Sequence, residues 1–182
     1  MKTIIEIDKR GSAGECFNFL LSAALPKKQY SDTKYEEILR YLYIDGDIGI
    51  CSDGYRMHTL DGINNTGYNL EPGHYAIVKN YVNTAQLSPV KPEREYPDWR
   101  VIIPTHRPPD KEFTWETGES FPYCFCNLLY RFPEPTFTNF NFVEPLYKVK
   151  ENWTCSWYGH DTQIKFECQR LNLMAVIMTI TK

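Results

Sequence analysis

The segment YLYIDGDIGICSDGYRMHTL, residues 41–60, constrains the fold of this chain more than any other stretch. Two apolar runs flank Asp45-Gly46, a dipeptide that favours the positive backbone φ angles of tight hairpin turns, so a β-hairpin is predicted here. The second strand runs into Ser52-Asp53-Gly54, and YRMHTL predicts a third strand after that turn. A meander of this kind forms an antiparallel sheet.

Residues 11–25 predict an amphipathic helix. Ser12 and Glu15 have the spacing of a capping box, in which two side chains satisfy free amides at the start of a helix. The spacing i, i+3, i+4 and i+7 predicts one apolar face, which consists of Phe17, Leu20, Leu21 and Ala24. Pro26 then ends the helix.

The remaining elements are predicted more coarsely. Strands are expected at residues 3–7, 96–104 and 113–117 and, near the end of the chain, at 154–160, 162–169 and 173–182. Other segments are expected to contain helix: 74–87 as a strand passing into a short helix, 121–132 as a short helix or a strand, and 141–151 as a short helix with Pro145 in its first turn. The order is a weak repeat of β-α-β-β units, which favours an α+β fold with antiparallel sheets.

A polar, proline-rich break at residues 105–112 is the best candidate for a domain boundary. We therefore expect two modules, residues 1–104 and 105–182. A chain of 182 residues is long enough to bury a core without disulfides or metals.

Charge and aromatic content limit the class of partner. The formal net charge is -3, so the chain as a whole is not a basic protein that wraps nucleic acid. Aromatic residues make up 15% of the chain, which is compatible either with a β-rich core edged by tyrosines or with a surface that stacks on partners.

The N-terminal residues MKTIIEIDKRG lack the apolar segment of a signal peptide, and no run approaches membrane-spanning length. We therefore expect a cytoplasmic chain that does not contact membranes, with its six cysteines reduced. Cys124 and Cys126 form a C-x-C pair, but no second Cys or His pair follows at zinc spacing, so no metal is expected.

No enzyme constellation is found in the sequence. The four histidines are scattered and none belongs to an H-E-x-x-H motif, and there is neither a G-x-S-x-G motif nor a phosphate-binding glycine loop. The acidic residues Glu36, Glu37, Asp45 and Asp47 lie at strand edges and a turn. We expect no enzymatic activity and no cofactor.

Three segments together resemble the β sliding clamps of bacterial DNA polymerase III. CSDGYRM, residues 51–57, is similar to the family pattern A-T-D-G-[HY]-R-L, YPDWRVIIP at 96–104 to F-P-D-Y-R-R-V-[IL]-P, and AVIMTITK at 175–182 to the ending V-I-M-P-M-R. The resemblance implies a DNA-clamp-like α+β fold of two pseudo-repeated modules. The first would resemble the middle clamp domain, and the second would be a condensed form of the last domain.

In that family the three segments converge on a pocket that receives a short apolar peptide from polymerases, the clamp loader and repair proteins. Carried over to this chain, the peptide-binding pocket comprises Ser52, Gly54, Tyr55, Arg56, Met57, Pro97, Ile102, Val176, Met178, Thr179 and Ile180. Methionine adapts to several partners, which suits Met57 and Met178 to such a site. The alternative is that Met178 and Ile180 are core residues of a strand and that Arg56 is a solvated charge.

Clamps of this family close into rings around DNA, and their helices present Lys and Arg to the phosphates. The predicted helix at 11–25 contains no Lys or Arg, and Thr179 stands where the family has proline. The candidate DNA contacts are Lys27, Lys28, Lys34, Tyr35 and Lys79. The alternative is a set of scattered, solvated lysines.

Two functions from different classes follow from the resemblance. The first is a compact processivity factor, of a phage or mobile-element type, that forms a dimer or trimer around double-stranded DNA and tethers a DNA polymerase or other clamp-binding-motif proteins. The second is a clamp-derived interaction protein that forms no ring and acts as a decoy or inhibitor of a host replication or defence complex.

Overall fold

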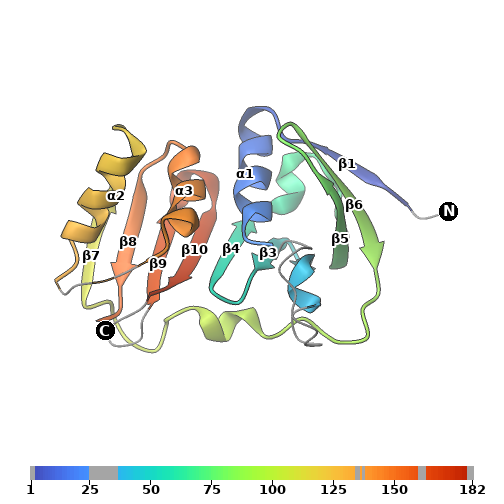
Figure 1. Cartoon of the computed structure of the whole chain (residues 1–182). Coiled ribbons are helices and arrows are strands. Elements are labelled where there is room, and N and C mark those ends of the chain that lie inside the picture. The colour runs from blue at the N-terminus through green and yellow to red at the C-terminus, as the bar shows by residue number, and fades with distance from the viewer. Residues whose placement is uncertain (1–2, 25–36, 134–135, 137, 160–162, 180–182) are drawn as a thin grey trace. The chain divides into compact units, whose positions relative to one another are not determined.

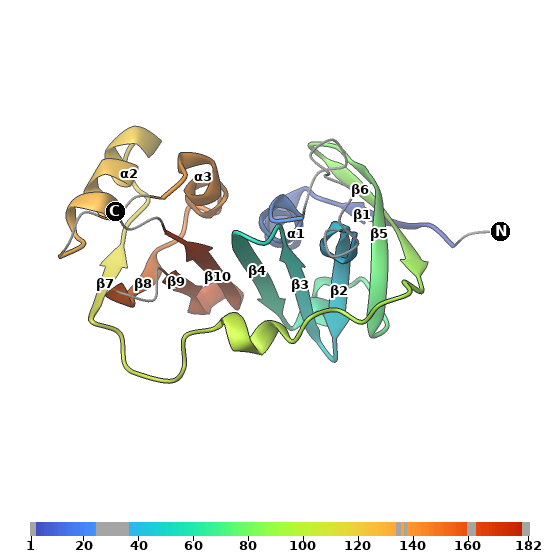
Figure 2. The same ribbon diagram turned by 60° about the horizontal axis from the view of Figure 1, so that its bottom comes forward.

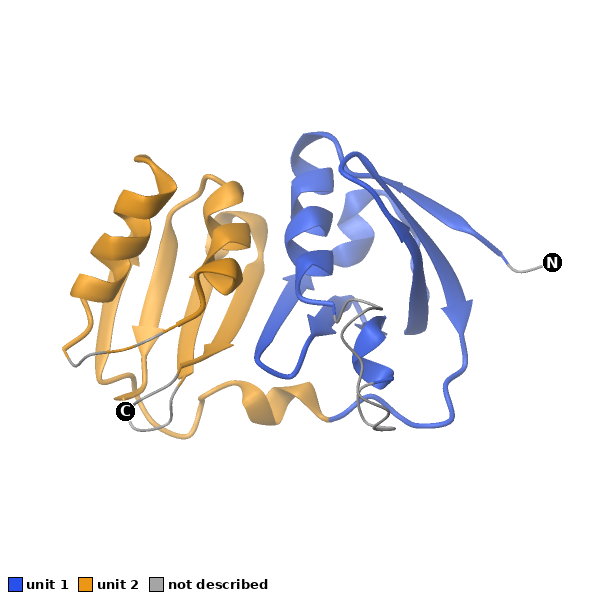
Figure 3. Cartoon of the chain, in the orientation of Figure 1, with its two compact units in different colours: residues 1–97 blue, residues 98–182 orange. Residues whose placement is uncertain are grey.

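The computed structural model describes residues 3–24, 37–133, 136, 138–159 and 163–179. They form two compact units, residues 1–97 and 98–182, which Figure 3 shows in different colours. The segment 98–104, which we expected to end the first module, belongs to the second unit. The strands of both units pair in antiparallel fashion and each unit contains helices, so the predicted α+β fold class is confirmed.

Unit 1 is built on an antiparallel sheet with the strand order β1-β6-β5-β2-β3-β4 (Figure 2). Its strands are β1 (Ile5–Asp8), β2 (Tyr41–Asp45), β3 (Ile48–Ser52), β4 (Arg56–Asp61), β5 (Gly73–Asn80) and β6 (Thr84–Val90). Two short 3₁₀ helices, η1 (Ile38–Arg40) and η2 (Ile63–Thr66), precede β2 and follow β4.

The predicted meander is confirmed. β2 and β3 pair with Asp45 opposite Ile48, and Gly46 in the connecting turn has a φ of 62°. β3 and β4 pair with Ser52 opposite Met57, and Gly54 in the second turn has a φ of 88°. Glycine adopts both angles without steric cost, which is why the two Asp-Gly dipeptides could be interpreted from the sequence.

Helix α1 (Gly11–Ser22) packs on β3 and β4 and buries Phe17, Phe19, Leu20 and Leu21. The predicted capping box is wrong, because the N-cap is Arg10 and makes no side-chain cap. The Asp8 carboxylate instead accepts hydrogen bonds from the Arg10 backbone N–H at 3.0 Å and from the guanidinium at 2.6 and 2.8 Å. These hydrogen bonds hold the pKa of Asp8 at about 2.

Two predictions of secondary structure are wrong, one in unit 1 and one in the segment where the chain passes from unit 1 to unit 2. Residues 74–87 contain no helix but form most of the β5–β6 hairpin, because Ala85 and Leu87 are buried at period two and pair with Ile7 and Ile5 of β1. Residues 96–104 form no strand. They contain the 3₁₀ helix η3 (Trp99–Ile102), in which the Asp98 carboxylate accepts a hydrogen bond from the Arg100 backbone N–H at 3.1 Å.

Unit 2 is an antiparallel sheet with the strand order β10-β9-β8-β7 and two helices on one face (Figure 1). Its strands are β7 (Lys111–Trp115), β8 (Trp153–Trp157), β9 (Gln163–Cys168) and β10 (Leu173–Met178), and the 3₁₀ helix η5 (Gln169–Leu171) joins the last two. The three predicted closing strands and the strand at 113–117 are confirmed, with small shifts of their ends.

Helices α2 (Phe121–Tyr130) and α3 (Phe140–Lys148) are each fixed to the sheet by a buried tryptophan. Trp115 Nε1 donates to the Cys124 carbonyl at 2.9 Å, and Trp153 Nε1 donates to the Leu146 carbonyl at 3.1 Å. The open alternative at 121–132 is thus resolved as a helix. Pro145 lies inside α3 rather than in its first turn, because the helix begins at Phe140 after the cap residue Asn139.

Candidate functional site

The turn between β3 and β4 is organised by Asp53. Its Oδ1 accepts hydrogen bonds from the backbone N–H groups of Tyr55 and Arg56, each at 3.0 Å, and its Oδ2 pairs with Arg56 Nε at 3.0 Å. The Asp53 and Arg56 side chains are only 10% and 12% exposed, so this ion pair is shielded from bulk water. One carboxylate therefore fixes both the backbone of the turn and the direction of Arg56.

Arg56 also connects the turn to the end of α1. Its Nη2 donates to the Ser22 carbonyl at 2.6 Å. A cation at the C-terminus of a helix is stabilised by the helix dipole and satisfies a carbonyl that has no partner within the helix. The alternative of a solvated Arg56 is therefore wrong, since the guanidinium is a structural part of the turn.

The same turn exposes Gly54 and Tyr55. The Ser52 hydroxyl donates to the Arg56 carbonyl at 2.8 Å and accepts from the Gly54 N–H at 3.2 Å, and these two hydrogen bonds link the two ends of the turn. Tyr55 is 66% exposed, whereas Ser52 and Met57 are buried at 5% and 1% exposure. The turn thus presents one amphipathic ring on a fixed backbone.

The other predicted pocket residues differ in how far they are exposed to solvent. Pro97 is exposed, and Ile102 in η3 is half-buried. In β10 and just after it, Val176 and Thr179 are buried at 1% and 6% exposure, whereas Met178 is 37% exposed. Ile180 lies outside the described residues. Tyr55 and Met178 are therefore the two large side chains of the predicted pocket that are exposed among the residues described.

The predicted DNA contacts are only partly within the described chain. Lys79 is exposed near the end of β5. Lys27, Lys28, Lys34 and Tyr35 lie outside the described residues. Helices α1 and α2 contain no Lys or Arg, and in α3 Lys148 pairs with Glu144 at 3.0 Å. The described helices thus present little positive charge.

His58, which the sequence did not single out, lies directly behind the turn on β4. Its ring is fully buried and stacks on Phe19 with 4.2 Å between ring centroids, and Nδ1 donates to the Phe19 carbonyl at 2.8 Å. Burial, reinforced by the positive charge of Arg56, lowers the pKa of His58 to about 3. The imidazole is therefore neutral at physiological pH and belongs to the core that supports the turn.

No group of three or more His, Cys, Asp or Glu side chains in the part of the chain that the structure describes is placed to hold a metal ion. No helix among the described residues is long and apolar enough to cross a membrane.

Comparison with known proteins identifies the fold. No model of a known protein family matches the chain, and no curated protein matches it in sequence. Solved structures do match. DNA polymerase III subunit β from Borrelia burgdorferi superposes with a TM-score of 0.56 at 13% identity, over 99% of this chain and 63% of that one.

Two further clamps give the same result. The DNA polymerase III β chain from Streptococcus pneumoniae has a TM-score of 0.58 at 11% identity over 100% of this chain and 66% of its own. The DNA polymerase sliding clamp from Bacillus subtilis has a TM-score of 0.56 at 12% identity over 99% and 64%. This chain thus spans just under two thirds of the length of these clamps. It has the fold of the bacterial DNA polymerase III β sliding clamps.

Proposed function

We propose that this chain is a sliding-clamp-like protein that binds a short apolar peptide motif of replication proteins. The observation that carries the proposal is the Asp53-anchored turn of a clamp-fold protein, which holds Tyr55 in an exposed position. Because the backbone of this turn is already ordered, little conformational entropy is lost when a partner binds the aromatic side chain of Tyr55. Tyrosine adds a large apolar surface and a polar hydroxyl, which is why it is frequent at binding sites.

Met178 is the second determinant that we assign to peptide binding. It is 37% exposed at the end of β10, next to the buried residues Ile177 and Thr179. Methionine is flexible and polarisable, so it can adapt to apolar side chains of different shapes. Because Tyr55 belongs to unit 1 and Met178 to unit 2, separate variants test the contribution of each segment.

The test is the affinity for a fluorescently labelled peptide that carries the clamp-binding motif of a bacterial replicative polymerase, measured by anisotropy. We expect Tyr55→Ala and Met178→Lys each to weaken binding by about tenfold or more, which corresponds to about 1.4 kcal/mol. Tyr81→Ala and Val82→Lys are matched controls, because these side chains on the β5–β6 turn are 61% and 83% exposed. They should leave the affinity unchanged.

Equal affinity of Tyr55→Ala, Met178→Lys and the wild type would reject the site. A peptide of the same composition in scrambled order should not bind. Amide NMR spectra of each variant establish that its fold is intact, so a loss of affinity cannot be attributed to unfolding.

The low positive charge of the described helices favours a clamp-like protein that binds peptides but does not close into a ring around DNA. A ring would need cations facing the DNA phosphates, and the cations of α1, α2 and α3 amount to Lys148, which is already paired with Glu144. We therefore propose a clamp-derived interaction protein that captures clamp-binding peptides, as a decoy or an inhibitor, rather than a processivity factor that encloses DNA.

This choice predicts the mass of a single chain by light scattering at every protein concentration, and no measurable binding to a nicked circular duplex. A stable dimer or trimer whose DNA affinity falls steeply with salt would contradict it. That result would instead favour the processivity factor, with the same peptide site.

A further inference from the structure

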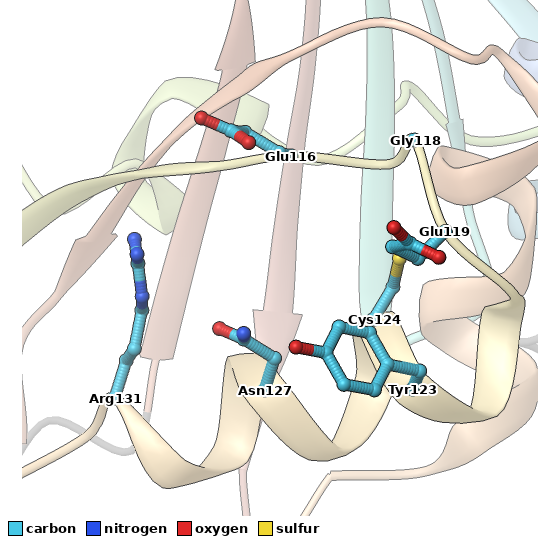
Figure 4. Close-up of a pocket in the computed structure, with 7 residues that line it drawn as sticks. All are labelled: Glu116, Gly118, Glu119, Tyr123, Cys124, Asn127 and Arg131. Carbon is cyan, nitrogen blue, oxygen red and sulfur yellow. The ribbon is translucent and has the colours of Figure 1, made fainter.

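A cavity of about 330 Å³ opens between the loop that follows β7 and one side of α2 (Figure 4). It is lined by Glu116, Gly118, Glu119, Tyr123, Cys124, Asn127 and Arg131, all of unit 2. Its size falls at the lower end of the range of small-ligand pockets, about 300–1,000 Å³, so it suits one side chain or a small molecule. None of these residues belongs to the peptide site proposed above.

The loop that forms one wall is held in place from two sides. The Tyr147 hydroxyl of α3 donates to the Glu119 carbonyl at 2.9 Å, and the buried Thr117 hydroxyl donates to the Glu151 carbonyl at 3.0 Å. On the opposite wall, Trp115 Nε1 holds α2 through the Cys124 carbonyl. The cavity is therefore formed before any ligand binds, which lowers the entropic cost of binding.

The side chains that face the cavity leave it with an uncompensated negative charge. Glu116 and Glu119 contribute two carboxylates, and neither has an ion-pair partner among the residues that the structure describes. Arg131 supplies one positive charge, but its Nη1 donates to the Thr114 carbonyl at 2.6 Å and its guanidinium lies 5.3 Å from the centre of the Phe113 ring. One added cation would neutralise the cavity.

Two neutral groups complete the cavity. Tyr123 is 60% exposed and, in Figure 4, projects from α2 between Asn127 and Glu119. An exposed aromatic face attracts a guanidinium through the π electrons of the ring, as Phe113 does for Arg131 within this chain. The amide oxygen of Asn127 and the hydroxyl of Tyr123 can accept further hydrogen bonds from the same cation.

We propose that this cavity binds the guanidinium of an arginine side chain of a partner protein. A guanidinium has five donors in one plane, so it can contact the Glu119 carboxylate, the Asn127 amide and the Tyr123 ring together. The compact ammonium of lysine is more strongly hydrated and matches fewer of these groups. An anionic ligand is disfavoured, because two carboxylates face the same space.

The test uses N-acetyl-arginine methylamide as the probe, with N-acetyl-citrulline methylamide as its uncharged isostere. Binding to the full chain is followed by the NMR amide signals of Gly118 and Asn127. We expect saturable shifts with the arginine probe, none with citrulline, and an affinity for the lysine analogue that is several-fold weaker. Added salt should weaken binding of the arginine probe.

The variant Glu119→Gln should weaken binding of the arginine probe by about tenfold, since a charge-assisted hydrogen bond becomes a neutral one. Glu6→Gln on β1 makes the same change of charge in unit 1 and should have no effect. Equal binding of arginine and citrulline, equal binding of arginine and lysine, or an unchanged affinity in Glu119→Gln would each overturn the proposal. Because the peptide site uses other residues, these results are independent of the function proposed above.

Discussion

Replacing Gly14 with alanine is expected to destabilise unit 1 by about 2–4 kcal/mol, although alanine is the better helix former. A Cβ atom at Gly14 would lie 2.0 Å from the Lys9 carbonyl carbon, 2.3 Å from its oxygen and 2.5 Å from its Cα. These are backbone atoms, so no rotation of a side chain can relieve the clash. Helix α1 would have to move away from the end of β1, and its buried residues Phe17 and Leu21 would lose packing.

The measurement is urea unfolding of the wild type and of Gly14→Ala by circular dichroism. Tryptophan fluorescence reports unit 2 separately, because Trp99, Trp115, Trp153 and Trp157 all lie in residues 98–182. Gly118→Ala is the matched control, since no atom lies within 4 Å of a Cβ built there. If the Gly14→Ala protein were as stable as the Gly118→Ala protein, Gly14 could not lie in close contact with the backbone of Lys9.

Lowering the pH from 7 to 5 is expected to cost unit 1 about 2 kcal/mol through His58 alone. The pKa of this buried histidine is lowered from 6.5 to about 3, so the unfolded chain takes up a proton in this range and the folded chain does not. The stabilising contribution is present above pH 6.5 and is lost as the pH falls toward the folded pKa. The folded chain does not take up this proton because burial, reinforced by the positive charge of Arg56, disfavours the charged imidazolium.

The contribution of His58 is isolated by comparison with His58→Phe, which keeps a ring against Phe19 but cannot titrate. The unfolding free energy of each protein is measured at several pH values between 7 and 5. His74, whose pKa burial also lowers, and the carboxylates are present in both proteins, so they cancel in the difference. His58→Phe should be less stable at pH 7 but should lose less stability on acidification. Parallel curves for the two proteins would rule out a buried neutral His58.

Local sequence signals predicted the strands and turns around the candidate site. They failed where contacts between distant parts of the chain determine the secondary structure. The two Asp-Gly turns were predictable because glycine satisfies their positive φ angles within a few residues. The second part of the segment 74–87 was predicted as helix but is a strand. Its register is set by pairing with β1, which is distant in sequence. The 3₁₀ helix at Trp99–Ile102 is capped by the Asp98 side chain, a local contact that apolar patterning does not reveal.

The same limit applies to the candidate sites. The resemblance drew attention to the segment 51–57, but not to the bond between Arg56 and the Ser22 carbonyl, because these residues lie on different elements. Nor does the alternation of β10 predict which of its residues is exposed, since Val176 and Ile177 are both buried whereas Met178 is not. The cavity beside α2 gave no signal, because 121–132 remained open as helix or strand and only a helix places Cys124 and Asn127 on one side.

The most direct measurement of peptide binding is an NMR titration of protein labelled with ¹³C at the methionine methyl groups. The chain has four methionines, so the spectrum is simple, and Met174 on the same strand as Met178 serves as an internal control. We predict that a peptide with the clamp-binding motif shifts the Met178 methyl signal saturably and leaves Met174 unchanged. An unshifted Met178 at saturating peptide, or a shift confined to Met174, would contradict the proposed binding site.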